Sequence, residues 1–173
     1  MQGCDEVFDV VNERDEVIGR ATRREVHERG LRHRAVHVLL FNPKNELFVQ
    51  KRSASKDTFP SHYDSSASGH LGSGEDYDAC AARELREELG LEVHPQELVR
   101  QFKIDACLET GWEFVWVYTL RGDYKPHVDP GEIETGEFWD LERVRAMIAS
   151  HPEQSAPSFC RIIGEAERRV LLR

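Results

Sequence analysis

The sequence predicts an α+β fold in which sheet elements are sandwiched by helices. Apolar runs rich in β-branched and aromatic residues recur in pairs around short polar turns, as is typical of neighbouring strands. Helical segments stand between and after these pairs, without the strict strand-helix alternation of parallel α/β proteins. A chain of 173 residues, of which 39% are hydrophobic, is long enough for one packed core. We therefore expect a single domain over residues 1–173.

The first segment of the chain predicts a hairpin followed by a short helix. Residues 6–20 (EVFDVVNERDEVIGR) contain two apolar runs on either side of a polar turn at 12–15. Thr22 then begins the run TRREVHERG, with Glu25 three residues later as in a capping box. Gly30 supplies a common type of helix stop. A helix is therefore expected between Thr22 and Gly30.

The next segment predicts two strands, a loop and a helix. The run AVHVLLF at 35–41 is nearly continuous in apolar residues and indicates a buried strand. The polar turn NPKN leads into a second strand at 47–51, antiparallel to the first. A polar, serine-rich loop is expected over 51–68. The helix that follows is expected to begin near Asp76 and to end at Gly90.

The C-terminal part of the chain predicts two further strands and two helices. The runs at 98–108 and 112–120 are strand candidates, and the second is rich in aromatic and β-branched residues. Residues 124–136 contain two prolines and two glycines and are expected to form a loop. A short strand then passes into a helix that begins at Leu141. A last helix is expected over 158–171.

The stretch GHLGSGEDYDACAARELREELGL at residues 69–91 contains the strongest candidate site. Glu84, Glu87 and Glu88 stand at i, i+3 and i+4, so they are neighbours on a helix, where like charges repel. A hard divalent ion such as Mg²⁺ takes carboxylate oxygens and would offset this repulsion. The glycine-rich loop before the helix allows the backbone to approach a ligand. A charged helix face in solvent is the alternative interpretation.

The same stretch resembles a complete Nudix box. That pattern is a glycine, five residues, a glutamate, seven residues, then Arg-Glu-aliphatic-x-Glu-Glu-x-Gly-aliphatic. All of its fixed places agree, and they hold Gly69, Glu75, Arg83, Glu84, Leu85, Glu87, Glu88, Gly90 and Leu91. The resemblance implies an α/β/α sandwich with a mixed sheet. It also implies cleavage of a nucleoside diphosphate linked to a further group, by attack of water on phosphorus.

The resemblance implies a role for each residue of the box. Glu84 and Glu88 would hold Mg²⁺, or Mn²⁺ in its place, with Gly69 contributing its carbonyl. Glu87 would be a ligand, directly or through water, and is also a candidate for activating the attacking water. Arg83 would orient the glutamates by ion pairing. A bound metal would neutralise the phosphoryl oxygens and supply a nucleophile.

A narrower resemblance extends over roughly residues 5–120. The segments HERGLRHRAVHVLLFN and LFVQKRSASKDTFPSHYDSSASGH, followed by the box, resemble the isopentenyl-diphosphate isomerase branch of the Nudix superfamily. In that isomerase three His and two Glu build a metal site, and a Cys stands two residues before the third His. His27, His33 and His70 stand at or near the His places, and Glu113 falls on one Glu place. Whether the three histidines form a second metal site stays open.

Two departures separate this chain from the isomerase pattern. Ser68 occupies the place of the isomerase's catalytic Cys, and Gly111 occupies the other Glu place. A serine hydroxyl is a much weaker acid than a thiol, so it is a poor substitute for proton transfer at carbon. The intact box therefore favours hydrolysis on an isomerase-like scaffold. Isomerisation of isopentenyl diphosphate and nucleotide binding without turnover are the alternatives.

Residues outside the box supply candidates for substrate contact and for proton transfer. Arg52 and Lys56, in KRSASK, would bind phosphates, with a solvated basic loop as the alternative. His70, beside the first glycine of the box, is a further substrate-binding candidate. Glu113 is the first choice for the group that activates water, and Glu132 and Glu134 are further candidates for the same role.

Two further predictions concern the remaining histidines and the head group of the substrate. His27 and His37 are expected to be packing or surface residues rather than ligands. Recognition of a base or head group would come from the loops at 53–68 and 124–136. The aromatic candidates for this contact are Phe59, Tyr63, Trp112 and Trp116.

Composition restricts the partners of the protein. A formal net charge of −9 argues against a nucleic acid polymer, which is bound mainly through Lys and Arg. The N-terminus lacks a basic segment followed by an apolar one, and no run approaches the roughly 18 apolar residues of a membrane span. The four cysteines form no CxxC pair and are expected to be reduced thiols. We expect a cytoplasmic protein that binds a small nucleotide or diphosphate, with its oligomeric state open.

Overall fold

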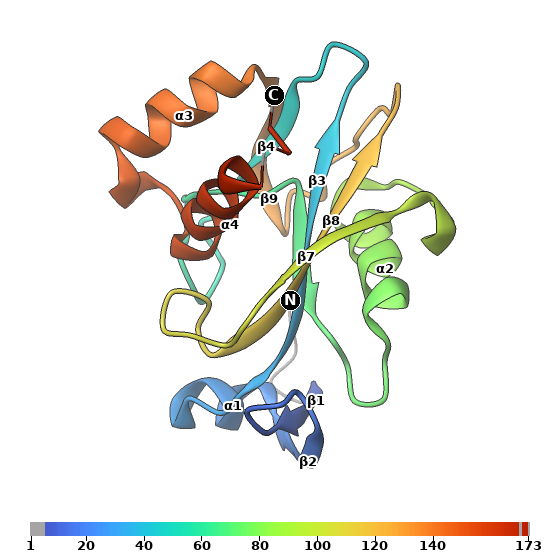
Figure 1. The fold of residues 1–173 in the computed structure, drawn as a ribbon, viewed down its shortest axis with the longest axis vertical. Helices are drawn as coiled ribbons and strands as arrows, with labels where there is room; N and C mark the ends of the chain where they lie inside the picture. The colour runs from blue at the N-terminus through green and yellow to red at the C-terminus, as the bar shows by residue number, and fades with distance from the viewer. Residues whose placement is uncertain (1–5, 170, 173) are drawn as a thin grey trace.

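A twisted central sheet with helices on both faces forms the body of the protein (Figure 1). The computed structural model describes residues 6–169 and 171–172. The strands are β1 (Val7–Val11), β2 (Val17–Thr22), β3 (His33–Phe41), β4 (Leu47–Arg52), β5 (Tyr63–Asp64), β6 (Ala67–His70), β7 (Val99–Ile104), β8 (Glu113–Arg121) and β9 (Ile133–Trp139). The helices are α1 (Arg23–Arg29), α2 (Tyr77–Leu89), α3 (Leu141–Ser150) and α4 (Pro157–Arg168), with short 3-10 turns η1 (Pro95–Glu97) and η2 (Pro152–Gln154).

The sheet is mixed, as the family resemblance implies. Its strands follow the order β5-β4-β3-β8-β7, with β6 paired to β3 and β9 paired to β4. Strand β3 runs parallel to β8 along its whole length and antiparallel to β6. The predicted α+β class is therefore confirmed, with a parallel pair at the centre of an otherwise antiparallel sheet.

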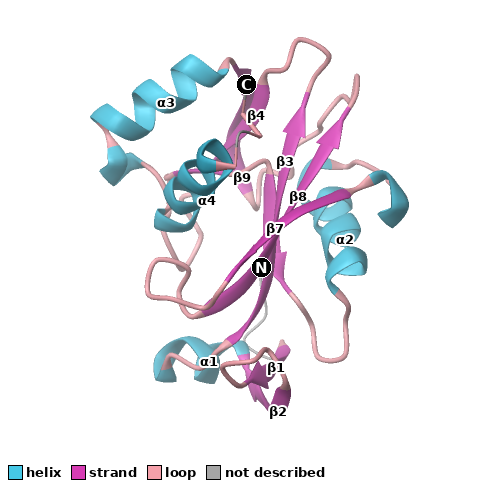
Figure 2. Cartoon of the chain, in the orientation of Figure 1, coloured by secondary structure: helices cyan, strands magenta, loops and turns pink. Residues whose placement is uncertain are grey.

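Two hydrophobic cores lie on opposite faces of the sheet. On one face Val36 and Val38 pack in a cluster with Leu85 and Leu89 of α2. On the other face a separate cluster joins the sheet to α3 and α4, and Leu39 packs there. Figure 2 shows α2 on one side of the strands and α3 and α4 on the other. A strand buried on both faces needs apolar residues at successive positions, which explains the continuous run in β3.

The N-terminal hairpin and α1 form as predicted. Thr22 caps α1 by accepting a hydrogen bond from the Glu25 backbone N–H, and the Glu25 carboxylate accepts from the Thr22 N–H at 2.9 Å. Gly30 ends the helix at a φ of 60°, in the left-handed region. The hairpin is tied to the box loop, because Asp9 accepts hydrogen bonds from the Ser73 hydroxyl and the Gly74 N–H.

The expectation of a polar loop over residues 51–68 is wrong in its second half, which contains β5 and the start of β6. Strands β3 and β4 pair only at Phe41 and Leu47, and β6 occupies the remaining edge of β3. The buried Ser66 hydroxyl joins the diverging strands: it accepts from the Leu40 N–H at 2.8 Å and donates to the Phe48 carbonyl at 2.6 Å. Serine here satisfies backbone groups inside the protein, so its polarity does not indicate a surface loop.

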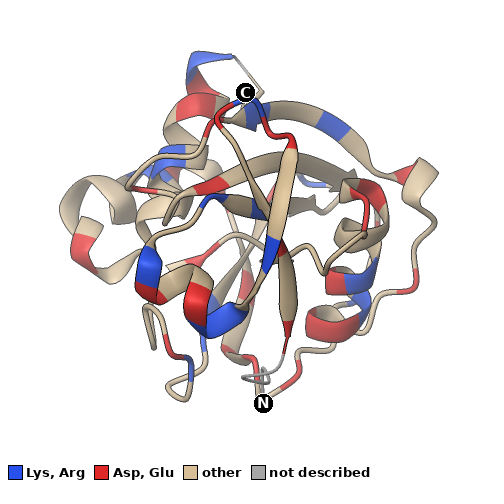
Figure 3. Cartoon of the chain, turned by 90° about the horizontal axis from the view of Figure 1, so that it is seen from below, with Lys and Arg blue, Asp and Glu red and all other residues tan. Residues whose placement is uncertain are grey.

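Other predicted boundaries differ by a few residues. Strand β9 begins at Ile133, within the segment expected to be a loop, because its residues pair with β4. Strand β7 ends at Ile104, four residues before the predicted end. Helices α3 and α4 lie where they were predicted. None of the described helices is long and apolar enough to cross a membrane. From the end that carries α1 and the hairpin, acidic and basic residues are interspersed (Figure 3).

Candidate functional site

Helix α2 buries two of the three box glutamates and exposes the third. Asp76 caps the helix by accepting from two backbone N–H groups, and Gly90 ends it at a φ of 63°. Glu84 is 7% exposed and Glu88 is 2% exposed, one helical turn apart. The Glu87 side chain, by contrast, is 49% exposed. The helix therefore presents one buried carboxylate pair and one carboxylate open to solvent.

Strand β6 passes directly over the buried pair. A Cβ at Gly69 would collide with the Glu84 carboxylate, so a larger residue here would displace either the carboxylate or the strand. The Ser68 backbone N–H donates to Glu88 Oε2 at 3.2 Å, and the Gln50 amide donates to the same oxygen at 3.0 Å. Gln50 was not identified from the sequence. The missing side chain at Gly69 lets the Glu84 carboxylate lie directly against the strand. We call this contact between β6 and the two carboxylates the cradle.

Arg83 is the ion-pair partner of the carboxylates around this cradle. Its guanidinium donates to both oxygens of Glu75 at 2.8 and 2.9 Å, to Glu84 at 2.5 Å and to Glu87 at 3.0 Å. It also donates to the His70 carbonyl at 3.0 Å. Glu75 further accepts from the Gly72 N–H at 2.9 Å. Arg83 and Glu75 thus brace the junction between the loop and the helix.

Electrostatics around the buried pair favour a bound cation. Burial raises the pKa of Glu84, and the neighbouring Glu88 raises it further, although Arg83 acts in the opposite direction. Burial likewise raises the pKa of Glu88, against the lowering effects of Lys56 and Gln50. Both carboxylates therefore resist ionisation in the absence of a metal. Two buried carboxylates form an all-oxygen donor set, which fits a hard divalent cation.

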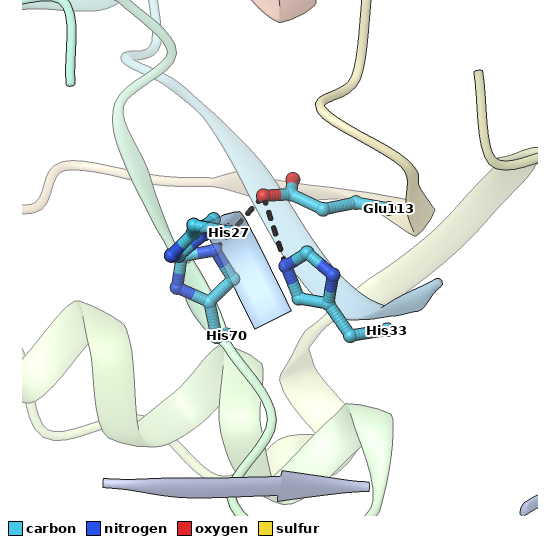
Figure 4. Close-up of side chains that lie close together, drawn as sticks. All are labelled: His27, His33, His70 and Glu113. Atoms are coloured by element: carbon cyan, nitrogen blue, oxygen red, sulfur yellow. Dashed lines mark hydrogen bonds and ion pairs between the residues drawn. The ribbon is translucent and has the colours of Figure 1, made fainter. Parts of the chain in front are cut away.

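A second cluster of metal-binding side chains lies on the other face of β6. His27 of α1, His33 at the start of β3, His70 at the end of β6 and Glu113 at the start of β8 converge there (Figure 4). One ligand atom from each lies within 4.8 Å of the others. The parallel register pairs His33 with Glu113, which explains how residues 80 positions apart meet. His70 and Gly69 are adjacent, so their positions face opposite sides of the strand.

The hydrogen bonds of the cluster assign the proton positions on two rings. His33 Nδ1 lies 2.9 Å from the Leu31 carbonyl, which can only accept, so in a neutral ring Nε2 carries the lone pair. His33 Nε2 lies 3.5 Å from Glu113 Oε1 and is the one fully buried side-chain N or O atom without a partner in the described part of the chain. Arg23 donates to His70 Nδ1 at 3.0 Å, so His70 Nε2–H donates to Glu113 at 2.8 Å.

The same surroundings shift the titration of the cluster. Burial lowers the pKa of His70 to about 4, against the effect of Glu113. Burial, then the neighbouring His33, lowers the pKa of His27. Burial acts to raise the pKa of Glu113, but His70 and His33 hold it well below its usual range. The neutral imidazoles of His27 and His70 therefore lie beside an ionised carboxylate, a donor set suited to a divalent transition metal.

A cavity of about 150 Å³ borders the cluster and β6. Three cations line it, and each is held by an acid: Arg52 by Asp64 at 3.1 Å, Arg23 by Asp57 at 3.3 Å, and Lys56 by Glu132. Ser68 and Gly69 also line it, and Ser68 is the residue whose N–H holds Glu88. The cavity therefore connects the histidine cluster with the backbone that covers the buried glutamates.

The structure sorts the predicted residues into groups. Gly69, Arg83, Glu84 and Glu88 meet at the cradle, and Glu87 joins them through Arg83. The residues that meet at the cavity are His70, Glu113, Arg52 and Lys56. His27, expected from the sequence to be a packing or surface residue, faces the cluster.

The cavity is also lined by residues that were missed or given no role, among them Arg23, His37 and Asp64. His37, expected to be a packing or surface residue, is 4% exposed. Glu134 pairs instead with Lys51 at 2.9 Å and does not line the cavity. The only sequence signal for Arg23 was its place directly after the helix cap.

Comparisons with known proteins give one family and two kinds of relative. The NUDIX domain family matches residues 31–161. "Uncharacterized Nudix hydrolase SCO1686" of Streptomyces coelicolor is 39% identical over 131 residues, covering 75% of this chain and 72% of that protein. "Isopentenyl-diphosphate Delta-isomerase 2" of Photorhabdus laumondii is 32% identical over 162 residues, covering 92% and 91%. The crystal structure of DR0079 from Deinococcus radiodurans matches with a TM-score of 0.80 at 34% identity, covering 92% and 98%.

Proposed function

Because this chain belongs to the Nudix family and is an enzyme of its hydrolase type, we propose that it is a Mg²⁺-dependent pyrophosphohydrolase. Its substrate is a nucleoside di- or triphosphate or a related derivative, and the bond cleaved is the diphosphate linkage. The observation that carries the proposal is the buried pair Glu84 and Glu88, two carboxylates whose repulsion a divalent cation would offset. The isomerase relative confirms the narrower resemblance without changing this choice.

The residues of the cradle are assigned to the metal. Glu84 and Glu88 would hold Mg²⁺, or Mn²⁺ in its place, with the Gly69 carbonyl as a further oxygen and Glu87 as a ligand directly or through water. When bound, the metal would neutralise negative charge on the phosphoryl oxygens and make a water molecule a better nucleophile. Arg83 holds Glu84 and Glu87 together through one guanidinium nitrogen, which supports its role in orienting both.

The chain's own residues supply the remaining functions. Arg52 and Lys56 would donate hydrogen bonds to the phosphates, and Arg23 lies in the same cavity as a third donor. Among the acids considered for activating water, Glu87 is exposed and shares Arg83 with Glu84. Glu113 accepts a hydrogen bond from His70. We therefore assign it first to the histidine cluster, and only as a second choice to proton transfer.

We assign the histidine cluster to a second divalent metal, on the basis of its orphaned atom. In a neutral His33 ring, Nε2 and the Glu113 carboxylate are two acceptors that face each other, and a cation between them would satisfy both. Metal binding through His70 Nε2 would expel the proton that now bonds Glu113. Arg23 would then have to leave His70 Nδ1, since that nitrogen would carry the proton instead.

The same cluster favours isopentenyl-diphosphate isomerisation as a second candidate function. His27, His33, His70 and Glu113 lie together as the isomerase resemblance implied. Ser68 lines the cavity at the place of the isomerase's Cys, and its hydroxyl is a weak acid for proton transfer at carbon. Incubating the protein with isopentenyl diphosphate and Mg²⁺ and recording NMR spectra should therefore show no isomer, and formation of the isomer would reverse the order of the two candidates.

The main test is a hydrolysis screen with a matched variant. Purified protein with Mg²⁺ should release phosphate or pyrophosphate from at least one member of a panel of nucleoside di- and triphosphates, nucleotide sugars, dinucleoside polyphosphates and coenzyme A. Glu88→Gln keeps the shape and the hydrogen bonds of the side chain but removes the charge, so turnover should fall at least about 100-fold. Glu92→Gln, at an exposed position, is the control. Release from no substrate, or wild-type turnover in Glu88→Gln, would contradict the proposal.

A further inference from the structure

His37 is a buried histidine in the wall of the cavity. It lies on β3 and is directly paired with Ser68 in the antiparallel register of β3 and β6. Directly paired residues extend to the same face of a sheet, and both side chains line the cavity with Arg52 and Lys56. His37 therefore borders the space into which the phosphate-binding cations project.

A chain of hydrogen bonds fixes the His37 ring. Nδ1 lies 2.6 Å from the Ser65 hydroxyl, and that hydroxyl donates to Asp64 Oδ1 at 3.3 Å. The Asp64 carboxylate can only accept, so the Ser65 proton points toward Asp64 and His37 Nδ1–H donates to Ser65. In a neutral ring, Nε2 then carries the lone pair. Burial lowers the pKa of His37, so the ring is neutral at neutral pH.

The His37 Nε2 atom has no protein partner among the described residues. In the described part of the chain, His33 Nε2 is the single side-chain N or O atom that is both inaccessible to solvent and without a hydrogen-bond partner. His37 Nε2 has no partner either, so it must be accessible. Nε2 is therefore open to the cavity. An acceptor in the wall of a site requires a donor from the ligand, because an unmatched polar group there costs binding free energy.

The acceptor is coupled to a phosphate-binding cation through one carboxylate. Asp64 Oδ2 accepts from Arg52 Nη1 at 3.1 Å, while Asp64 Oδ1 lies 3.8 Å from His37 Nδ1. Asp64 thus positions both Arg52 and His37. A ligand group that donates to His37 must lie close to a phosphate that Arg52 binds.

We propose that His37 determines specificity by accepting, through Nε2, a hydrogen bond from a hydroxyl or amine group attached next to the diphosphate. The inference rests on the proposed hydrolysis and adds the chemistry of the neighbouring group. A nucleoside supplies sugar hydroxyls and base amines to this acceptor. A prenyl diphosphate supplies no donor and would leave Nε2 unpaired, and sites built around such a hydrogen bond reject analogues that lack it.

The experiment compares two substrates in three proteins. The substrates are a nucleoside diphosphate and methyl diphosphate, which lacks the donor, and the proteins are wild type, His37→Phe and His37→Gln. The ratio of kcat/KM for the two substrates should fall at least about 10-fold in His37→Phe. His37→Gln places an amide oxygen near the position of Nε2 and should keep the ratio within about 3-fold. If the role of His37 were purely structural, kcat/KM would fall equally for both substrates and the ratio would not change. That result would overturn the proposal.

Two additions keep this test separate from the test of hydrolysis. If wild type cleaves neither substrate, the proposed reaction fails, and the specificity of His37 is read from calorimetric affinities with Mg²⁺. The ligands are then an α,β-methylene nucleoside diphosphate and methylenediphosphonate, and the same change in ratio is expected. If His37→Phe does not fold, Ser65→Ala removes the hydroxyl that fixes the ring and should lower the ratio as well. An unchanged ratio in Ser65→Ala, beside a folded His37→Gln, would overturn the proposal.

Discussion

Two buried glutamates of α2 define the site at the scale of single residues. Glu84 and Glu88 are nearly sealed from solvent, and the arginine beside them contacts Glu84 but also Glu75 and Glu87. One guanidinium therefore offsets the charge of several carboxylates, and the pair resists ionisation without a metal. Such a pair lowers stability in the metal-free protein, which is common where a site is built for binding.

The first prediction concerns Mg²⁺ and pH. The folded-state pKa of Glu84 and of Glu88 is raised, so the stability that their protonation gives is lost as pH rises through the folded-state pKa values. The Tm of EDTA-treated protein should therefore fall between about pH 6.5 and about pH 8.5. Mg²⁺ replaces the lost protons and should raise the Tm more at the higher pH. About 1 kcal/mol corresponds to about 2–4 °C in a protein of this size.

Control measurements separate this effect from other titrations. The pKa of His70 is lowered to about 4, so its unfolded form binds more protons than the folded form only below about pH 6.5, its ordinary value. Its acid destabilisation therefore lies outside the chosen range. Glu88→Gln should show a smaller Mg²⁺ shift and, without metal at the higher pH, a Tm at or above that of wild type. An undiminished Mg²⁺ shift in this variant would remove Glu88 from the metal site.

At the scale of elements, the site is the contact between one helix and one strand. Helix α2 is defined by its own sequence, because Asp76 and Gly90 cap it and apolar residues line its buried face. Strand β6 is defined by its partners: it has no apolar pattern, and pairing with β3 positions it over the carboxylates. The strand can approach this closely because Gly69 has no side chain.

A pair of glycine substitutions tests this contact. Gly69→Ala would place a Cβ against the Glu84 carboxylate, so that either β6 or the carboxylate must move. We expect kcat/KM to fall at least about 100-fold, because misplacing a reacting group by about 1 Å costs about this much. Gly72→Ala is the matched control in the same loop, since its Cβ would meet only Glu75, at 3.8 Å. Equal activity of the two variants would show that the cradle does not position Glu84.

At the scale of the whole molecule, two cores hold the sheet from opposite faces. One core joins the strands to α2 and so fixes the height of the box helix above β6. The other joins them to α3 and α4. Leu85 and Ile162, one from each core, are both completely buried. Truncating each side chain therefore distinguishes an effect on stability from an effect on the position of the site.

Truncation in the two cores should have similar effects on stability and different effects on activity. Leu85→Ala and Ile162→Ala should each lower the free energy of unfolding by about 2–5 kcal/mol, measured with urea, because each leaves a cavity. Leu85 neighbours Glu84 on α2, so its truncation should also lower kcat/KM, whereas Ile162→Ala should stay within about 3-fold of wild type at a temperature where both are folded. The reverse order of activities would show that the α2 core does not position the site.

The sequence by itself determined the features that depend on neighbouring residues. Local spacing and turn chemistry, which involve only residues close together in the chain, predict four features. These are the hairpin, the capping box at Thr22, both ends of α2 and the box residues that meet at the cradle. The resemblance of the box identified the carboxylates and their arginine. None of these depends on which strands lie side by side.

Only the tertiary structure decided which residues share the cavity. The parallel pairing of β3 with β8 brings His33 beside Glu113, and the pairing of β3 with β6 brings His37 beside Ser68. Strand β6 itself (ASGH) has no apolar pattern, and the Ser66 hydroxyl just before it bonds backbone groups of β3 and β4. Strand register depends on contacts between segments far apart in the chain, and no local periodicity encodes it. The helix that carries the box glutamates is therefore specified locally, whereas the second cluster and the set of residues around the cavity are consequences of the assembled sheet.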